Sequence, residues 1–260
     1  MVAQADKSVP ALQARSLELA WGERGRVIAD DVSLEVRPRE VVCLVGRSGC
    51  GMSTVVHALS GLLVPRSGEV LLHGEDVTGI PGRVSYMLQK DLLLPNLTVL
   101  DNACLPLVLA GMPRDEAREK ARPLLERFGL EGSEGYWPAQ LSGGMRQRAA
   151  FLRTYLMDND VVLLDEPFSA LDAITRVEMR SWFCAMVREL GLSALVVTHD
   201  VDEAVSMASR IYVMSGDSAH KVPSAIVGEV AVARPKDAGE EFELTPEFIA
   251  AKREVLTLLG

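Results

Sequence analysis

Residues 41–45 form a continuous apolar run with several β-branched side chains, and Gly46 ends it. Such a run is typical of a strand buried on both faces, as in the parallel core of an α/β protein. A glycine-rich stretch follows, and apolar residues then recur at helical spacing over 53–63. The order of strand, glycine-rich loop and helix predicts an α/β core in which this loop joins a buried strand to a helix.

The loop has the spacing of a phosphate-binding loop, G-x-x-x-x-G-K-[ST], with one residue changed. Its residues are Gly46, Arg47, Ser48, Gly49, Cys50, Gly51, Met52, Ser53 and Thr54. The glycines let successive backbone N–H groups point at phosphate oxygens, and the helix that begins near Ser53 adds the positive end of its dipole. We expect the Ser53 hydroxyl to bind Mg²⁺ and Thr54 to bind a phosphate oxygen. Met52 stands where the pattern has lysine.

A second apolar run, residues 161–164, leads into the acids Asp165 and Glu166. Open α/β sheets bind ligands at the carboxyl ends of their strands, so both carboxylates are candidates for the same site as the loop. We expect Asp165 to hold Mg²⁺, through water, and Glu166 to act as general base on an attacking water. From this motif alone, a strand that merely ends in a solvated acidic turn is an equal alternative.

The stretch L-S-G-G-M-R-Q-R, residues 141–148, resembles the signature motif of ABC-type ATPases, which few other families share. The other family positions are matched by Gln89 (Q-loop), Asp172 in S-A-L-D (D-loop), His199 (switch histidine) and Trp21 (the aromatic that often stacks on adenine). The resemblance covers about residues 12–215, with every motif in the family's order. Residues 90–95 and 169–172 look most like the importer subunits for nitrate, sulfonates, taurine and pyrimidine precursors.

This resemblance implies an ATP-binding subunit that uses ATP and Mg²⁺ to drive import through separate membrane permease chains. Gln89 and His199 would act with Glu166 in hydrolysis, and Gln89 would also contact Mg²⁺. It further implies a head-to-tail homodimer, in which each loop faces the signature of its twin. Ser142, Gly143, Gly144 and Asp172 would then contact the nucleotide of the partner molecule. A solute-binding protein would be an indirect partner, and the subunit would lie at the cytoplasmic face of the membrane.

Three of the candidate residues also have a purely structural interpretation. His199 could be a histidine at the edge of the core, but its fit to the ordered set of motifs outweighs that interpretation. Trp21 could pack against a sheet edge instead of stacking on adenine. Cys50 precedes a helix N-terminus, where a thiolate would be favoured, although packing is the usual role of such a cysteine.

The pattern of elements predicts an α/β fold: a P-loop NTPase core with a flanking antiparallel β-sheet and an inserted α-helical subdomain. The expected segments are 1–89 and 159–220 for the core, 90–158 for the helical subdomain and 221–260 for a C-terminal extension. Pro123 should kink or divide a helix over 114–128. A last helix starts after Thr245. Its apolar face is expected to contain Phe248, Ile249, Val255, Leu256 and Leu259.

Composition excludes several other classes of protein. The net charge is −9 without a block of basic residues, so a nucleic acid is an unsuitable partner. Apolar runs reach only strand length, and the polar N-terminus argues against secretion. The cysteines are too widely spaced for a zinc site or a disulfide framework, and we expect reduced thiols.

Met52 is the departure from the family. Methionine matches lysine in length, so the loop should still fold, but the cation that would reach the β- and γ-phosphates is lost. We expect weaker ATP binding and hydrolysis close to background. A disabled variant, a partner that supplies the competent site and compensation by Arg47 are three explanations. The competing functions are a non-hydrolysing nucleotide sensor or scaffold, and a soluble ABC protein not tied to transport.

Overall fold

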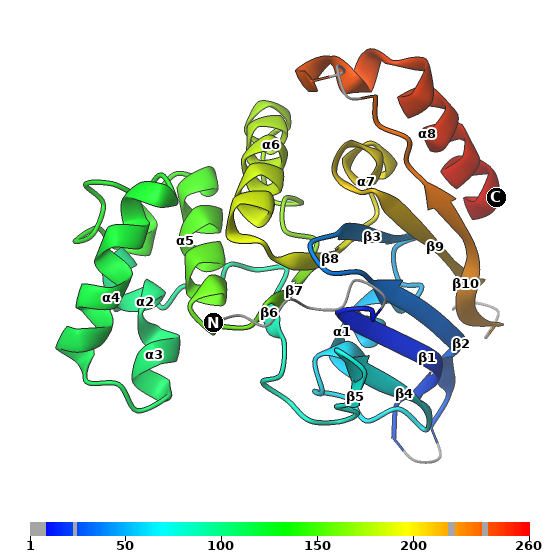
Figure 1. Ribbon diagram of the computed structural model, residues 1–260, viewed down its shortest axis with the longest axis horizontal. Helices are drawn as coiled ribbons and strands as arrows, with labels where there is room; N and C mark the ends of the chain where they lie inside the picture. The colour runs from blue at the N-terminus through cyan, green and yellow to red at the C-terminus, as the bar shows by residue number, and fades with distance from the viewer. Residues whose placement is uncertain (1–8, 23–24, 218–221, 236–238) are drawn as a thin grey trace.

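The computed structural model describes residues 9–22, 25–217, 222–235 and 239–260. Within these residues one mixed sheet runs through the molecule (Figure 1). Its strands lie in the order β5 (Glu75–Asp76), β4 (Ser67–Leu72), β1 (Leu12–Ala20), β2 (Val27–Val36), β10 (Val222–Ala231), β9 (Arg210–Asp217), β3 (Val41–Gly46), β8 (Ser193–Thr198), β7 (Val161–Asp165) and β6 (Ser85–Met87).

The sheet has a parallel half and an antiparallel half. β3 pairs in parallel with β8 and β9, and β7 pairs in parallel with β8 and β6. β1 pairs antiparallel with β2 and β4. β10 joins the halves: it is antiparallel to β9, and its Ser224 pairs with Ala29 of β2 in parallel. The predicted core with a flanking antiparallel sheet is confirmed.

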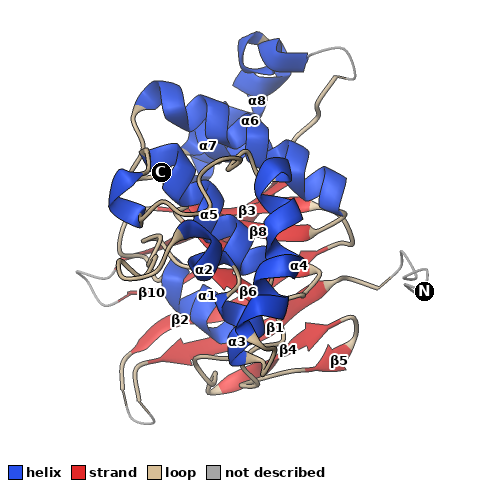
Figure 2. Ribbon diagram, turned by 90° about the vertical axis from the view of Figure 1, so that its left-hand side faces the viewer, coloured by secondary structure: helices blue, strands red, loops and turns tan. Residues whose placement is uncertain are grey.

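Both faces of the parallel half are buried, which explains its near-continuous apolar sequences. Successive side chains of a strand point to opposite faces. Cys43 and Val45 of β3 therefore join one apolar cluster, while Val42 and Leu44 join the other. The second cluster also contains α1 (Met52–Leu59), which follows β3 through the glycine-rich loop. Figure 2 shows the antiparallel strands below and the α6–α8 helices above the parallel strands.

Helices α2 (Val99–Ala103), α3 (Leu105–Leu109), α4 (Arg114–Arg127) and α5 (Gly143–Tyr155) gather on one side of the sheet, with the short turn η1 (Pro138–Gln140) before α5 (Figure 1). α4 is a single helix with Pro123 inside it, so the expected division does not occur. Asp101 of α2 holds α4 through ion pairs to Arg114 and Arg118 at 2.9 and 2.8 Å. Those bonds and the buried Leu125 help to keep the helix continuous across its proline.

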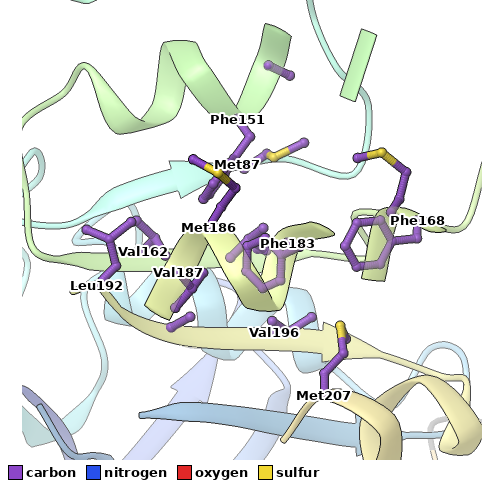
Figure 3. Packing of buried hydrophobic residues seen from close by; sticks show 14 of the residues in the cluster. Met87, Phe151, Val162, Phe168, Phe183, Met186, Val187, Leu192, Val196 and Met207 are labelled. Carbon is purple, nitrogen blue, oxygen red and sulfur yellow. The ribbon is translucent and has the colours of Figure 1, made fainter. Parts of the chain in front are cut away.

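The helical group packs on the sheet through α6 (Ala173–Leu190). Phe151 of α5 meets Phe183 of α6 edge to face, with ring centroids 5.2 Å apart. Phe168 lies on the other side of Phe183, at 5.9 Å (Figure 3). Aromatic pairs of this geometry add to the free energy of burial. The position of α5 relative to the parallel strands is thus fixed by a contact that belongs to the core.

The chain ends with α7 (Val201–Met207), η2 (Gly239–Leu244) and α8 (Pro246–Leu259). The Thr245 hydroxyl accepts the Phe248 N–H and caps α8, as expected. The expected apolar face is wrong in part: Phe248 and Val255 are buried, but Ile249 and Leu256 are 52% and 48% exposed. They lie on the same flank of α8 as Lys252, Arg253 and Thr257.

The expected division of the chain into core, helical subdomain and C-terminal extension stays a prediction. In the sheet itself, β10 belongs to the expected extension yet lies between β9 and β2. Among the described residues, no helix combines the length and the hydropathy that a membrane span requires.

Candidate functional site

A cavity of about 590 Å³ opens at the carboxyl ends of the parallel strands. Its wall brings together Trp21, the loop residues 48–54, Gln89, the acids Asp165 and Glu166, and His199. These residues come from five separate stretches of the chain. The sequence motifs for a phosphate loop, an acidic strand end and three isolated positions therefore meet in one site.

The loop is shaped so that a helix begins directly against this cavity. Gly51 has a φ of 99°, and a side chain there would come within 2.7 Å of Ile28. Its carbonyl accepts the N–H groups of Thr54 and Val55 at 3.0 and 3.1 Å. α1 begins at Met52, one residue earlier than expected, and its first turn lines the cavity. The positive end of the helix dipole is thus directed at whatever anion enters.

Asp165 is the last residue of β7 and is 7% exposed. Burial raises the pKa of its carboxyl group, the negative charge of Glu166 adds to the rise, and a hydrogen bond from the Ser53 hydroxyl opposes it. The Tyr86 hydroxyl also donates to this carboxylate, at 3.4 Å. A buried carboxylate whose ionised form is disfavoured is well placed to gain a cation.

The donor set fits Mg²⁺. Ser53 and Asp165 place a hydroxyl and a carboxylate oxygen together, and both line the cavity with Gln89. Mg²⁺ prefers oxygen ligands and is usually held by one or two protein groups plus phosphates and water. No group of three or more histidine, cysteine or acidic side chains suited to a metal occurs in the part of the chain that the structure describes. The protein therefore offers a partial coordination shell, which a nucleotide would complete.

Glu166 is held on both carboxylate oxygens. Gln89 Nε2 donates to one at 3.1 Å, and His199 Nδ1 lies 2.9 Å from the other. The Glu166 backbone has a φ of 45°, and its N–H donates to the Val197 carbonyl at 2.8 Å. The side chain is 18% exposed and lines the cavity. The three residues predicted to be catalytic thus form one hydrogen-bonded group, with a carboxylate able to accept a proton.

Met52 lines the same cavity but also belongs to the apolar core. It is 6% exposed and packs in one cluster with Cys50 and Met214. Its sulfur lies 3.2 Å from the position that a side chain at Gly46 would take. The methionine therefore fills space beneath the loop and contributes no positive charge to it.

Arg47 does not replace the missing cation here. Its guanidinium group donates to the backbone carbonyl of Gly260, and the residue is absent from the cavity wall. Trp21 is 63% exposed at the cavity, as a stacking platform requires. The thiolate hypothesis for Cys50 is wrong: the residue is 4% exposed, and burial raises the pKa of its thiol. All four cysteines are free, as expected.

The signature and D-loop residues lie elsewhere. Ser142 and Asp172 cap α5 and α6, accepting the N–H groups of Met145 and Thr175. None of Ser142, Gly143, Gly144 and Asp172 lines the cavity, and neither does Gly46, which ends β3. A side chain on Gly143 would meet Leu171 at 3.0 Å, so the two motifs adjoin each other. One molecule therefore has two separate candidate phosphate sites.

Sequence reasoning missed five residues of the cavity wall. Arg26 directly precedes β2 and Ile28 lies at its start, Val197 comes from β8, and Val222 and Ser224 come from β10. Arg26 follows a glycine, without a motif around it, and nothing in the sequence distinguishes it from other surface arginines. The β10 residues lie far along the chain and reach the cavity only because β10 joins the two halves of the sheet.

Residues 29–169 match the ABC transporter family. The chain belongs to this family. It is 36% identical to the formylaminopyrimidine import ATP-binding protein ThiZ of Halalkalibacterium halodurans, over 95% of this chain and 96% of that protein. It is also 36% identical to the taurine import ATP-binding protein TauB of Yersinia pestis, over 91% and 93% of the two chains. The aliphatic sulfonates import ATP-binding protein SsuB of Cupriavidus necator is 41% identical, over 83% of this chain and 68% of that protein.

Solved structures agree on the fold. The dimeric ABC transporter cassette MJ0796 superposes with a TM-score of 0.70 at 26% identity, covering 85% of this chain and 99% of that one. A structure of the same cassette in a post-hydrolysis state with ADP and Pi has the same TM-score. The CbiO1 chain of a CbiONQ transporter reaches 0.76 at 22% identity, covering 95% and 99% of the two chains. The predicted family, its nearest importer group and the P-loop NTPase fold are confirmed.

Proposed function

We propose that this chain is the ATP-binding subunit of an importer, which couples ATP binding and hydrolysis to the uptake of a small solute. The observation that carries the proposal is the single cavity that gathers the aromatic Trp21, the phosphate loop, the acids and His199. The relatives named as import ATP-binding proteins for formylaminopyrimidine, taurine and sulfonates support it.

Each group of the cavity wall has a binding or catalytic role that fits its position. Trp21 stacks on the adenine, and the N-terminus of α1 binds the phosphates. Ser53, Gln89 and Asp165 would hold Mg²⁺, which would supply positive charge to the phosphate oxygens. Glu166 accepts a proton from the attacking water, while its bonds to Gln89 and His199 fix the direction of its carboxylate.

A second copy of the chain completes the site. Ser142, Gly143 and Gly144 present a helix N-terminus that has no phosphate loop of its own molecule beside it, because they lie outside the cavity wall. In a head-to-tail homodimer, this N-terminus and Asp172 close over the nucleotide of the other molecule. The dimeric state of the cassette MJ0796 supports this arrangement.

The membrane permease docks beside Gln89, at the cytoplasmic face of the membrane. Leu88, directly before Gln89, and Leu92 and Leu94, in the segment after it, are 40–50% exposed. Arg153 of α5 donates to the backbone carbonyls of Asp91 and Leu92, so the segment has a defined shape. Its apolar side chains suit a permease helix, and closing the dimer would move that helix. A solute-binding protein would act on the outer side and would not touch this chain.

Hydrolysis is impaired by Met52. The residue lies in the core and supplies no charge to the phosphates, although the remaining groups of the site are in place. That combination also favours a second candidate function, a nucleotide-binding scaffold that closes on ATP without turning it over.

Two measurements test the proposal. Mg²⁺–ATP should bind the chain with a fluorescence change that Trp21→Ala weakens, and membrane permease chains should co-purify with it from detergent extracts. The double variant Leu92→Asp/Leu94→Asp should lose those chains. Leu244→Asp, at a leucine that is 80% exposed in η2, is the matched control and should retain them. Permease retention by the double variant, or a complete absence of ATP binding, would contradict the proposal.

A further inference from the structure

Tyr86 lies next to the candidate Mg²⁺ site without being part of the cavity wall. It is the middle residue of β6, which pairs in parallel with β7, the strand that ends at Asp165. Its hydroxyl donates to Asp165 Oδ2 at 3.4 Å, and the residue does not line the cavity that contains the phosphate loop. Any effect of Tyr86 on a ligand in that cavity is therefore carried by the carboxylate of Asp165.

The ring of Tyr86 is held from the side of α1. It packs against the apolar cluster that contains α1, and it meets the His57 ring edge to face, with centroids 6.0 Å apart. His57 lies about one helical turn after Ser53 on the same helix. Because the ring is held by the core and by α1, its hydroxyl has a defined position relative to Asp165.

Asp165 is a buried carboxylate that accepts hydrogen bonds from two kinds of donor. It is 7% exposed, and the Ser53 and Tyr86 hydroxyls both donate to it. Ser53 is itself a candidate Mg²⁺ ligand, whereas Tyr86 lies outside the candidate coordination shell. Burial, and then the charge of Asp165, raise the pKa of Tyr86, so its hydroxyl keeps the proton that it donates. Hydrogen bonds of this kind orient a ligating carboxylate.

We propose that Tyr86 is a positioning residue for Mg²⁺, whose hydroxyl fixes the direction in which Asp165 presents its carboxylate to the metal or to a water bound to it. The inference rests on the proposed function, because it takes Mg²⁺–ATP as the ligand of the cavity. Removing a partner outside the coordination shell costs about 10- to 100-fold in metal affinity. At 3.4 Å the hydrogen bond is long, so the lower end of that range applies here.

A purely structural role makes a different prediction. If the hydroxyl of Tyr86 only satisfies a buried acid, its loss lowers the stability of the folded protein and changes ATP binding equally with and without metal. A positioning role changes the contribution of Mg²⁺ to ATP binding and leaves binding without metal intact. The two roles therefore differ in a quantity that does not depend on hydrolysis.

Titration calorimetry with ATP, in EDTA and in saturating Mg²⁺, measures this quantity as the ratio of the two dissociation constants. By linkage, the ratio also states how much more tightly Mg²⁺ binds ATP on the protein than ATP in solution. Tyr86→Phe keeps the ring and removes the hydroxyl. It should lower the ratio about tenfold and leave the dissociation constant in EDTA unchanged.

Tyr155→Phe is the matched control, because this tyrosine of α5 packs on Phe128 at 5.7 Å and does not line the cavity. It should keep the ratio of the unaltered chain. The inference fails if Tyr86→Phe also keeps that ratio, or if it weakens ATP binding equally in EDTA and in Mg²⁺. Absence of ATP binding by the unaltered chain under both conditions would instead overturn the proposed function, and this inference with it.

Discussion

The side chain of Met52 is part of both the candidate ATP cavity and the apolar core. It lines the candidate ATP cavity and is also packed in the core with Cys50 and Met214. Met52→Lys should raise ATP hydrolysis by about 10²–10³, because a cation would then meet the charge that develops on the phosphates. Lysine can extend its amine to the cavity while its methylene chain stays in the core. Phosphate release under saturating Mg²⁺–ATP is the measurement.

The neutral variant Met52→Gln is the control for this change. It has similar length and no charge, so it should leave turnover at the level of the unaltered chain. Equal activity of the lysine variant and the unaltered chain would show that the missing cation does not limit the rate.

The expected role of Arg26 follows from its place in the cavity wall and not from a sequence motif. Its permanently charged side chain lines the cavity whose phosphate loop has Met52 in the place of lysine. We expect Arg26→Gln to weaken ATP binding about 10- to 100-fold, since a charged hydrogen bond contributes roughly 1.5–3 kcal/mol. Titration calorimetry with Mg²⁺–ATP would measure it. Arg37→Gln, at an arginine far from the cavity wall, should bind ATP normally.

At the scale of elements, Arg210 joins four strands. It starts β9, is 7% exposed and forms ion pairs with Glu35 of β2, Glu229 of β10 and Glu40, which precedes β3. Removing one partner from a buried charge network leaves the others unpaired. Because the three acids are 12–46% exposed, Arg210→Met should lower the free energy of unfolding by about 1.5–3 kcal/mol in urea titrations. Arg37→Met, which breaks a largely exposed pair with Glu35, should cost no more than about 1 kcal/mol.

The contact between α6 and α7 contains a buried acid with its own pH dependence. Glu203 is 2% exposed, and one of its carboxylate oxygens has no hydrogen-bond partner. Burial, and then the charge of Asp200, raise its pKa from 4.5 to about 7, against the opposing charges of Arg180 and Arg176. Between those pH values the folded protein keeps a proton that the unfolded chain releases, so the free energy of unfolding falls as pH rises.

Glu203→Gln mimics the protonated acid and should remove this dependence. We expect the variant to be more stable than the unaltered chain at pH 8, by about 2–3 kcal/mol, and nearly equal at pH 4.5. Urea unfolding at both pH values tests it. Glu131→Gln, on an exposed loop, should show no such difference. A constant gap between Glu203→Gln and the unaltered chain at both pH values would contradict the titration.

Sequence patterns predicted the elements well where one physical cause dominates. The apolar run at 41–45 and the glycine-rich loop led directly to β3 and α1. The sequence patterns failed where contacts with distant parts of the chain decide the local structure. Pro123 is tolerated because α4 is held by Asp101 and by its buried face, and these contacts cannot be inferred from the proline itself. Arg26 and Ser224 reach the cavity only through the pairing of β10, which no local pattern encodes.

For the whole molecule, the proposed dimer makes a separate prediction. Ser142→Asp keeps a side chain that can cap α5 but sets a negative charge where the partner's terminal phosphate would lie. ATP-dependent dimers, measured by light scattering after size-exclusion chromatography, should be lost, while ATP binding by the single molecule should persist. Ser142→Thr caps the helix without adding charge and should still dimerise. A dimer that survives the aspartate would place the interface elsewhere.

The place of β10 in the sheet has a consequence for biosynthesis. The phosphate loop leaves the ribosome early, yet Val222 and Ser224, which wall the same cavity, are made more than 160 residues after Thr54. β10 also lies between the two halves of the sheet. A nascent chain therefore carries an open, half-built pocket through most of translation, and ATP can act as a folding ligand only in the final stage of synthesis.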